Sequence, residues 1–137
     1  MYLLALAAVA LASVFDLRSR EIPDWISAGL LASCLVLLAL GRHPVDGQGV
    51  LWGVGVATLG ALVLFSLNAL GGGDVKLLIA LGATLGVGAF IPFALAMTIA
   101  GGVLALRARR RGEREIAYAP AMLIGLLALA PLTWMAR

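Results

Sequence analysis

A long stretch of almost uncharged sequence constrains this chain most. Between Val50 and Leu106 the only charged side chains are those of Asp74 and Lys76. In the whole chain 63% of the residues are hydrophobic and 12% are charged, about half the charged share of a soluble domain. The composition predicts an all-α integral membrane protein, and the 137 residues allow one domain, residues 1–137, of about six transmembrane helices.

Apolar runs mark the expected spans. The first run, Met1 to Phe15, contains no Lys or Arg, and its first positive charges, Arg18 and Arg20, follow it. A secretory signal peptide carries its positive charge before the apolar core, so the sequence predicts a retained first span. Further spans are expected over residues 25–40, 50–69 and 116–135.

The apolar run over residues 75–106 is too long for one span. A straight helix of this length would measure roughly 48 Å, against a hydrocarbon core of about 30 Å. Gly82, Gly86, Gly88 and Pro92 fall near its middle. We therefore expect two spans joined by a tight turn near Gly86 to Pro92.

Positive charges are divided unevenly between the expected loops. With six spans, the first, third and fifth loops share a side and carry eight of the ten Lys and Arg residues, most of them between Arg107 and Glu115. With five spans, one side of the membrane would carry four Lys and Arg residues and the other side six. Because Lys and Arg concentrate in cytoplasmic loops, the sequence predicts six spans and an N-terminus outside. The basic run is expected to contact anionic lipid or, alternatively, an acidic residue of a substrate; no nucleic-acid partner is expected.

One polar turn, Leu70-Gly71-Gly72-Gly73-Asp74-Val75-Lys76, interrupts the apolar sequence. An acid at the end of a membrane segment is costly and by default marks a functional site. Three glycines before the acid allow the backbone to leave the helix and another chain to approach closely. A second acid, Asp16, ends the first expected span. The expected topology places both acids at the cytoplasmic boundary of the membrane.

Asp16 and Asp74 form a candidate catalytic pair. Two neighbouring carboxylates cannot both ionise easily, so they tend to share one proton. The ionised member can take a proton from water while the protonated member polarises a peptide carbonyl, which is the chemistry of an aspartic protease. Neither role is assigned to one residue, because the pair titrates as a unit. Gly71, Gly72 and Gly73 are candidates for aligning an extended substrate on a backbone without side chains.

The content of cysteine and histidine excludes several kinds of site. The chain has one cysteine, Cys34, and one histidine, His43. An intrachain disulfide, a Cys-x-x-Cys zinc module and a multi-histidine metal site are therefore excluded. No metal and no cofactor are predicted.

The residues around both acids resemble a known family. Residues 71–74 match the Gly-x-Gly-Asp motif of intramembrane aspartyl proteases. Asp74-Val75-Lys76-Leu77-Leu78, the loop Asp16…Arg20-Glu21-Ile22-Pro23 and Tyr118-Ala119-Pro120 resemble the type IV prepilin peptidases. The resemblance covers nearly the whole chain, and among these enzymes the chain is similar to the small peptidases of tight-adherence (Flp-type) pilus systems.

This resemblance implies an activity and a set of partners. It implies an aspartic endopeptidase with Asp16 and Asp74 as catalytic residues, supported by the three glycines and Lys76. It also implies cleavage after a glycine in the leader of a prepilin or pseudopilin, at the cytoplasmic face of a bacterial inner membrane. Larger members carry paired Cys-x-x-Cys motifs linked to N-methylation, which this chain lacks, so a peptidase without methyltransferase activity is expected.

Simpler interpretations stay open for several residues. Asp16 can be a solvated charge at a helix end, and Asp74 can cap the helix that follows it, a role compatible with catalysis. Lys76 is expected to anchor the cytoplasmic side, because a residue at i+2 does not face Asp74 on a regular helix. Glu21 and Asp24 are expected in a solvated loop and are the reserve catalytic candidates.

A different class of function is also compatible with two membrane acids. The chain would then be a small transporter or channel subunit that uses Asp16 and Asp74 as a proton or cation relay. A relay favours acids near the middle of the bilayer, whereas both of these acids are expected at one boundary. The positions therefore favour the peptidase.

Overall fold

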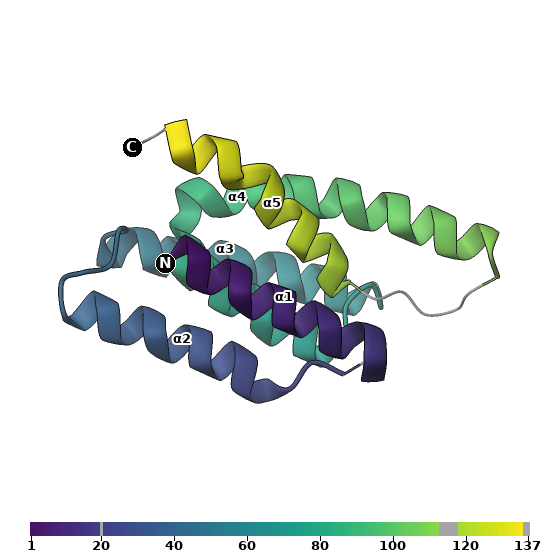
Figure 1. Ribbon diagram of the computed structural model, residues 1–137, viewed down its shortest axis with the longest axis horizontal. Coiled ribbons are helices and arrows are strands. Elements are labelled where there is room, and N and C mark those ends of the chain that lie inside the picture. The colour runs from purple at the N-terminus through teal and green to yellow at the C-terminus, as the bar shows by residue number, and fades with distance from the viewer. Residues whose placement is uncertain (20, 113–117, 136–137) are drawn as a thin grey trace.

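The described residues form five helices and no strand. The computed structural model describes residues 1–19, 21–112 and 118–135. The helices are α1 (Tyr2–Ser19), α2 (Asp24–Ala39), α3 (Gly47–Ser66), α4 (Gly72–Arg110) and α5 (Ala119–Met135), arranged as in Figure 1. The prediction of an all-α protein is confirmed.

Three helices, α1, α3 and α4, are long and apolar enough to cross a membrane. The helices α2 and α5 are shorter and also apolar. Many large apolar side chains of these helices are exposed, among them Leu3, Leu51, Leu59 and Ile99. These properties are those of a helical membrane protein. The number of spans and the side of the N-terminus stay predictions.

Gly86 divides α4 into two arms. The helix has 39 residues, and Gly86 has non-helical backbone angles, φ 66° and ψ 169°. This region of backbone space is open essentially to glycine alone. The first arm, residues 72–85, runs back along α3, and the second arm, residues 87–110, returns in the opposite direction (Figure 1). The reversal at Gly86 lies within residues 86–92, where the sequence predicted a turn. The turn is shorter than expected, because Gly88 and Pro92 already belong to the helical second arm.

Glycines allow close packing where α3 crosses the first arm of α4. A Cβ atom at Gly53 would overlap the carbonyl oxygen of Gly82, and one at Gly82 would overlap the Cβ of Ala57. Gly55 and Gly60, which also offer flat surfaces, have no such neighbour. The two backbones therefore approach through Gly53 and Gly82, which fixes the position of α4 against α3.

Several helix boundaries differ from the prediction, including those of α3, which spans Gly47–Ser66 rather than residues 50–69. Asp16 lies inside α1, which continues to Ser19, and α4 begins at Gly72 rather than after Asp74. The basic run was expected to be a loop from Arg107 to Glu115, but α4 continues through Arg110. Ala and Arg favour helix, and the helix ends only before Gly112, whose φ is 73°. Glu113 to Glu115 lie outside the described residues.

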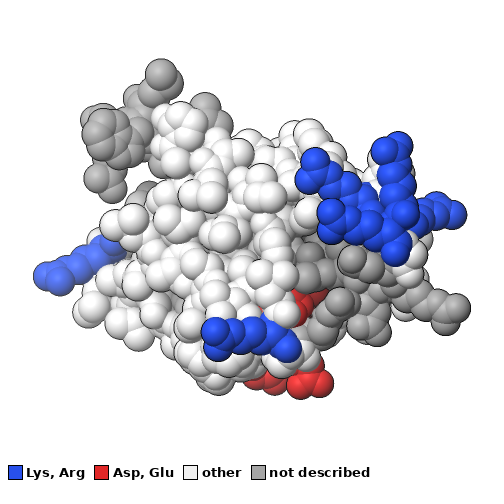
Figure 2. Space-filling model, turned by 45° about the vertical axis from the view of Figure 1, so that its right-hand side comes forward, with Lys and Arg blue, Asp and Glu red and all other residues white. Residues whose placement is uncertain are grey.

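The ends of several helices gather at one end of the molecule. The end of α1, the end of α3, the start of α4 and the end of its second arm all point to the right in Figure 1. Figure 2 turns this end forward and shows a dense group of Lys and Arg side chains beside a largely uncharged surface. The exposed arginines at the end of α4 are Arg107, Arg109, Arg110 and Arg111.

The helix α5 joins α1 to the second arm of α4. The hydroxyl of Tyr2 donates a hydrogen bond to the carbonyl oxygen of Leu126. On the other side, a Cβ atom at Gly125 would lie 3.1 Å from the backbone nitrogen of Met97. The helices α1, α4 and α5 thus pack as one unit, and this unit carries both candidate acids.

Candidate active site

A small pocket of about 230 Å³ contains both candidate acids. Its lining comes from three places: the end of α1, the segment before α2, and the start of α4. The lining residues are Asp16, Glu21, Ile22, Asp24, Gly71, Gly72, Gly73 and Asp74. The sequence singled out every one of these residues except Ile22 as a candidate for the site, and the structure brings them together.

Asp16 is held in the last turn of α1 with 6% of its surface exposed. Its Oδ2 accepts a hydrogen bond of 3.1 Å from the backbone N–H of Ala119. Ala119 is the first residue of α5, and the first amides of a helix have no partner within the helix. A carboxylate at this position is also favoured by the helix dipole. Asp16 is therefore a buried, oriented side chain rather than a solvated charge at a helix end.

Asp74 lies in the first turn of α4 with 9% of its surface exposed. Its Oδ2 accepts a hydrogen bond of 3.1 Å from the backbone N–H of Gly71, the residue that caps the helix. This bond is the acidic half of a capping box. Its other oxygen, Oδ1, is buried and has no hydrogen-bond partner within the described part of the chain. Capping thus occupies one oxygen and leaves the second free to bind a water or a substrate carbonyl.

The carboxylates of Asp16 and Asp74 lie near enough to act on each other electrostatically. Asp16 and Asp74 come from helices that are far apart in sequence, line the same pocket and repel each other electrostatically. Each accepts a backbone N–H at the start of a helix, Ala119 for Asp16 and Gly71 for Asp74. One proton shared between them would relieve the repulsion, as expected for two close carboxylates.

The three glycines play different roles in the structure. Gly71 has an extended backbone and donates its N–H to Asp74, whereas Gly72 and Gly73 are already helical. The expectation that the glycines leave the helix is therefore correct only for Gly71. A Cβ atom at Gly73 would lie 3.0 Å from the Cβ of Ile22, so a side chain there would push against the segment before α2. At Gly72 a Cβ atom would meet nothing within 4 Å.

Lys76 pairs with Asp24 rather than with Asp16 or Asp74. Its Nζ lies 2.6 Å from Oδ2 of Asp24, and both side chains are largely exposed. The pair joins the first turns of α2 and α4 at the edge of the pocket. Glu21 is exposed on the same rim. Of the two reserve candidates, Asp24 is thus committed to an exposed ion pair, and neither is buried as Asp16 and Asp74 are.

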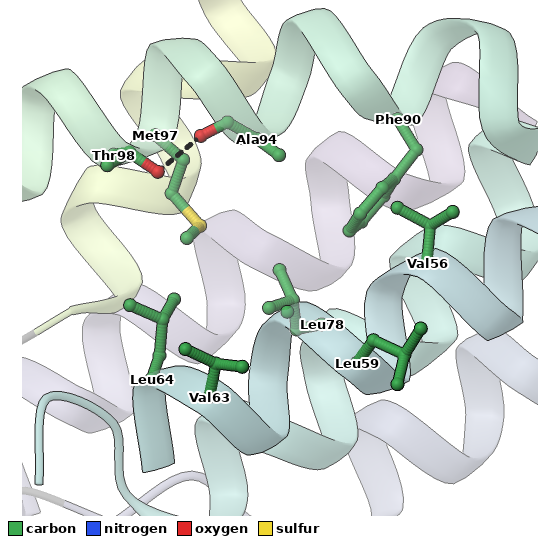
Figure 3. A pocket seen from close by; sticks show the side chains of 10 residues that line it. Val56, Leu59, Val63, Leu64, Leu78, Phe90, Ala94, Met97 and Thr98 are labelled. Atoms are coloured by element: carbon green, nitrogen blue, oxygen red, sulfur yellow. Dashed lines mark hydrogen bonds between the residues drawn. The ribbon is translucent and has the colours of Figure 1, made fainter. Parts of the chain in front are cut away.

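A larger hollow in the described structure offers no reactive group. It is a groove of about 480 Å³ between α3 and the second arm of α4, with Leu78 at its floor (Figure 3). Thr98 is the one polar side chain among its lining residues, and its hydroxyl donates to the carbonyl of Ala94 at 2.7 Å. The small pocket with two acids, and not the large apolar groove, is the candidate active site.

Sequence reasoning missed the contribution of Ala119. The donor is a backbone N–H, which every residue except proline carries, so its side chain gives no signal. The sequence marks the position only through the motif Tyr118-Ala119-Pro120. The structure shows that this motif starts α5 directly beside Asp16.

A comparison with protein-family models found a match over most of the chain. The model of the type IV leader peptidase family matches residues 3–106, a range that includes both acids and the glycine turn. Comparison with curated proteins and with solved structures gave no match.

Proposed function

This chain belongs to the type IV leader peptidase family, and from this membership we propose that it is a membrane-embedded aspartic endopeptidase. One observation carries the proposal: Asp16 from α1 and Asp74 from α4, distant in sequence, line one pocket. Both carboxylates are buried, and Oδ1 of Asp74 has no hydrogen-bond partner among the described residues, which supports a pair that could share a proton.

The pair would hydrolyse a peptide bond without a covalent intermediate. The ionised carboxylate takes a proton from a water, and the water oxygen attacks the carbonyl carbon. The protonated carboxylate donates its proton toward the carbonyl oxygen, which becomes a hydroxyl of the tetrahedral intermediate. As the C–N bond breaks, the carboxylate that took the proton from water gives it to the leaving amine, and the other carboxylate takes the hydroxyl proton of the intermediate as the carbonyl re-forms. One carboxylate ends protonated and the other ionised, so the pair is restored.

We propose prepilin-like proteins as the substrates. The substrate class follows from the resemblance of the motifs to prepilin peptidases, with cleavage in the leader at the cytoplasmic face of a bacterial inner membrane. The absence of Cys-x-x-Cys pairs from the sequence favours the small tight-adherence (Flp-type) branch and a peptidase without methyltransferase activity. Both acids lie at helix ends beside the segments that join the helices, which favours the peptidase over a proton or cation relay.

Co-expression with a candidate prepilin tests the proposal. Membranes that contain the chain should shorten the prepilin by its leader, scored by mass spectrometry of the new N-terminus. A matched strain that expresses the Asp74→Asn variant at the same level is the control. Intact prepilin in the presence of the unchanged chain, for prepilins of the tight-adherence type, would refute the proposed substrate class.

A further inference from the structure

One aromatic ring, that of Tyr118, contacts α4 where α5 begins. Tyr118 precedes α5, and its carbonyl oxygen accepts hydrogen bonds from the N–H groups of Ala121 and Met122 at 2.9 and 3.2 Å. These are the first backbone bonds of the helix, so Tyr118 is its capping residue. The position of Tyr118 therefore determines where the first amide of α5, that of Ala119, lies.

The ring of Tyr118 rests directly on the backbone of α4 at Gly101. Gly101 is buried, and a Cβ atom there would lie 2.8 Å from Cε1 of the Tyr118 ring and 3.2 Å from its Cζ and hydroxyl oxygen. Real Cβ atoms do not make contacts as short as 2.8 Å, so a side chain at this position would move the ring. At the neighbouring Gly102 a Cβ atom would meet nothing within 4 Å. The close contact is thus specific to Gly101.

These contacts form a chain of three steps that ends at Asp16. Gly101 sets the position of the Tyr118 ring, Tyr118 sets the start of α5, and the N–H of Ala119 binds Oδ2 of Asp16. Ala119 is fully buried, so no water competes for this bond at the surface of the residue. A shift of the ring that is transmitted to the Tyr118 backbone would displace the amide that orients the carboxylate.

We propose that Gly101 and Tyr118 are positioning residues for Asp16: the ring packed on the Gly101 backbone places the Ala119 amide that orients the catalytic carboxylate. The inference rests on the proposed function, because it assigns a catalytic role to Asp16. Neither Gly101 nor Tyr118 lines the candidate active site, so both act through the Ala119 amide.

A pair of adjacent glycine substitutions gives a matched test. Gly101→Ala and Gly102→Ala make the same chemical change in the same helix, but only Gly101→Ala moves the Tyr118 ring. We expect Gly101→Ala to lower kcat for leader cleavage about 10- to 100-fold, since a displacement of about 1 Å can cost that much. KM should stay within about twofold, because neither substitution replaces a residue that lines the pocket. Gly102→Ala should cleave like the unchanged chain. Equal kcat values for the two variants would overturn the inference.

Tyr118 variants keep the test decisive if Gly101→Ala folds poorly. Tyr118→Phe retains the ring and should retain kcat, whereas Tyr118→Ala should lose kcat to the same extent as Gly101→Ala. If both positions act through one contact, the double variant should be no worse than either single variant. A Tyr118→Phe variant as inactive as Tyr118→Ala would contradict the role of the ring. Asp74→Asn in the same assay separates the two ideas: if Asp74→Asn is inactive and Gly101→Ala is fully active, only the positioning inference fails.

Discussion

Lys76 and Asp24 form an ion pair of 2.6 Å that ties the first turn of α4 to the first turn of α2. Both residues sit beside the two buried acids, yet their side chains are 56% and 70% exposed. A pair this exposed contributes about 0–1 kcal/mol to stability. The charged side chains near the pocket are therefore of two kinds. Lys76 and Asp24 form an exposed ion pair at its edge, whereas Asp16 and Asp74 are buried and line the pocket.

The first prediction concerns the buried pair. Asp16→Asn and Asp74→Asn each keep the size of the side chain but remove the carboxylate that must hold or release a proton. Either change should abolish leader cleavage, and the double variant should be no worse, because the two groups act as a unit. The measurement is the fraction of prepilin processed by membranes at matched expression.

Asp46→Asn is the control for these variants. Asp46 caps α3 by accepting the N–H of Gly49 at 3.2 Å, and asparagine is an equally good cap, so folding and cleavage should be retained. Substantial processing by Asp74→Asn would end the aspartic-protease proposal. For the unchanged chain, activity should depend on pH through two apparent values that belong to the pair, because the mechanism needs the pair to hold one proton.

The second prediction concerns the reversal inside α4. Gly86→Ala should destabilise the protein by about 1–3 kcal/mol, because its backbone angles are open essentially to glycine alone. The new Cβ would also lie 2.6 Å from Cγ1 of Val45. Gly88→Ala is the matched control, since a Cβ there meets nothing within 4 Å and alanine favours helix. Thermal unfolding in detergent measures both, and equal midpoints for the two variants would refute this explanation.

The third prediction concerns topology. Eight of the ten Lys and Arg residues lie in the first, third and fifth expected loops. Reporter domains fused after Gly47 should therefore be found outside the cell membrane, and those fused after Gly112 in the cytoplasm. A cytoplasmic reporter at Gly47 would contradict the arrangement of six spans with the N-terminus outside.

The fourth prediction concerns metal and methyl chemistry. Cys34 Sγ and His43 Nε2 lie 3.4 Å apart, but among the described residues no group of three His, Cys, Asp or Glu side chains has an arrangement that could hold a metal ion. Leader cleavage should therefore survive strong chelators. The purified chain should transfer no methyl group from S-adenosylmethionine to the new N-terminus. Methylated pilin made by this chain alone would contradict a peptidase-only enzyme.

The proximity of the two acids could be predicted because a charge in apolar sequence is a strong signal. Asp74 was identified as an acid inside a long apolar stretch and Asp16 as the acid that ends the first expected span, and the structure places both in one pocket. The reversal of the long apolar run was also predictable, since its length exceeds one span and Gly86 lies near its middle. The first feature follows from the free energy needed to place a charge in apolar surroundings, and the second from the thickness of the hydrocarbon core of a membrane.

Helix ends and backbone contacts were less predictable. Asp16 was expected after the first helix, but no residue that breaks a helix occurs before Pro23, and α1 continues to Ser19. The start of α4 at Gly72 depends on the bond between Asp74 and Gly71, which outweighs the poor helix propensity of glycine. Packing of a ring on Gly101 requires the positions of both α4 and α5, which one sequence does not contain.

The bond from Ala119 to Asp16 also gives the molecule an order of assembly. Asp16 belongs to the first of the five helices to leave the ribosome, and its amide donor belongs to the last. Until α5 has formed and docked, the carboxylate of Asp16 lacks the amide that orients it. The geometry of the candidate pair is therefore completed last, and it depends on the path of the chain from its first helix to its fifth.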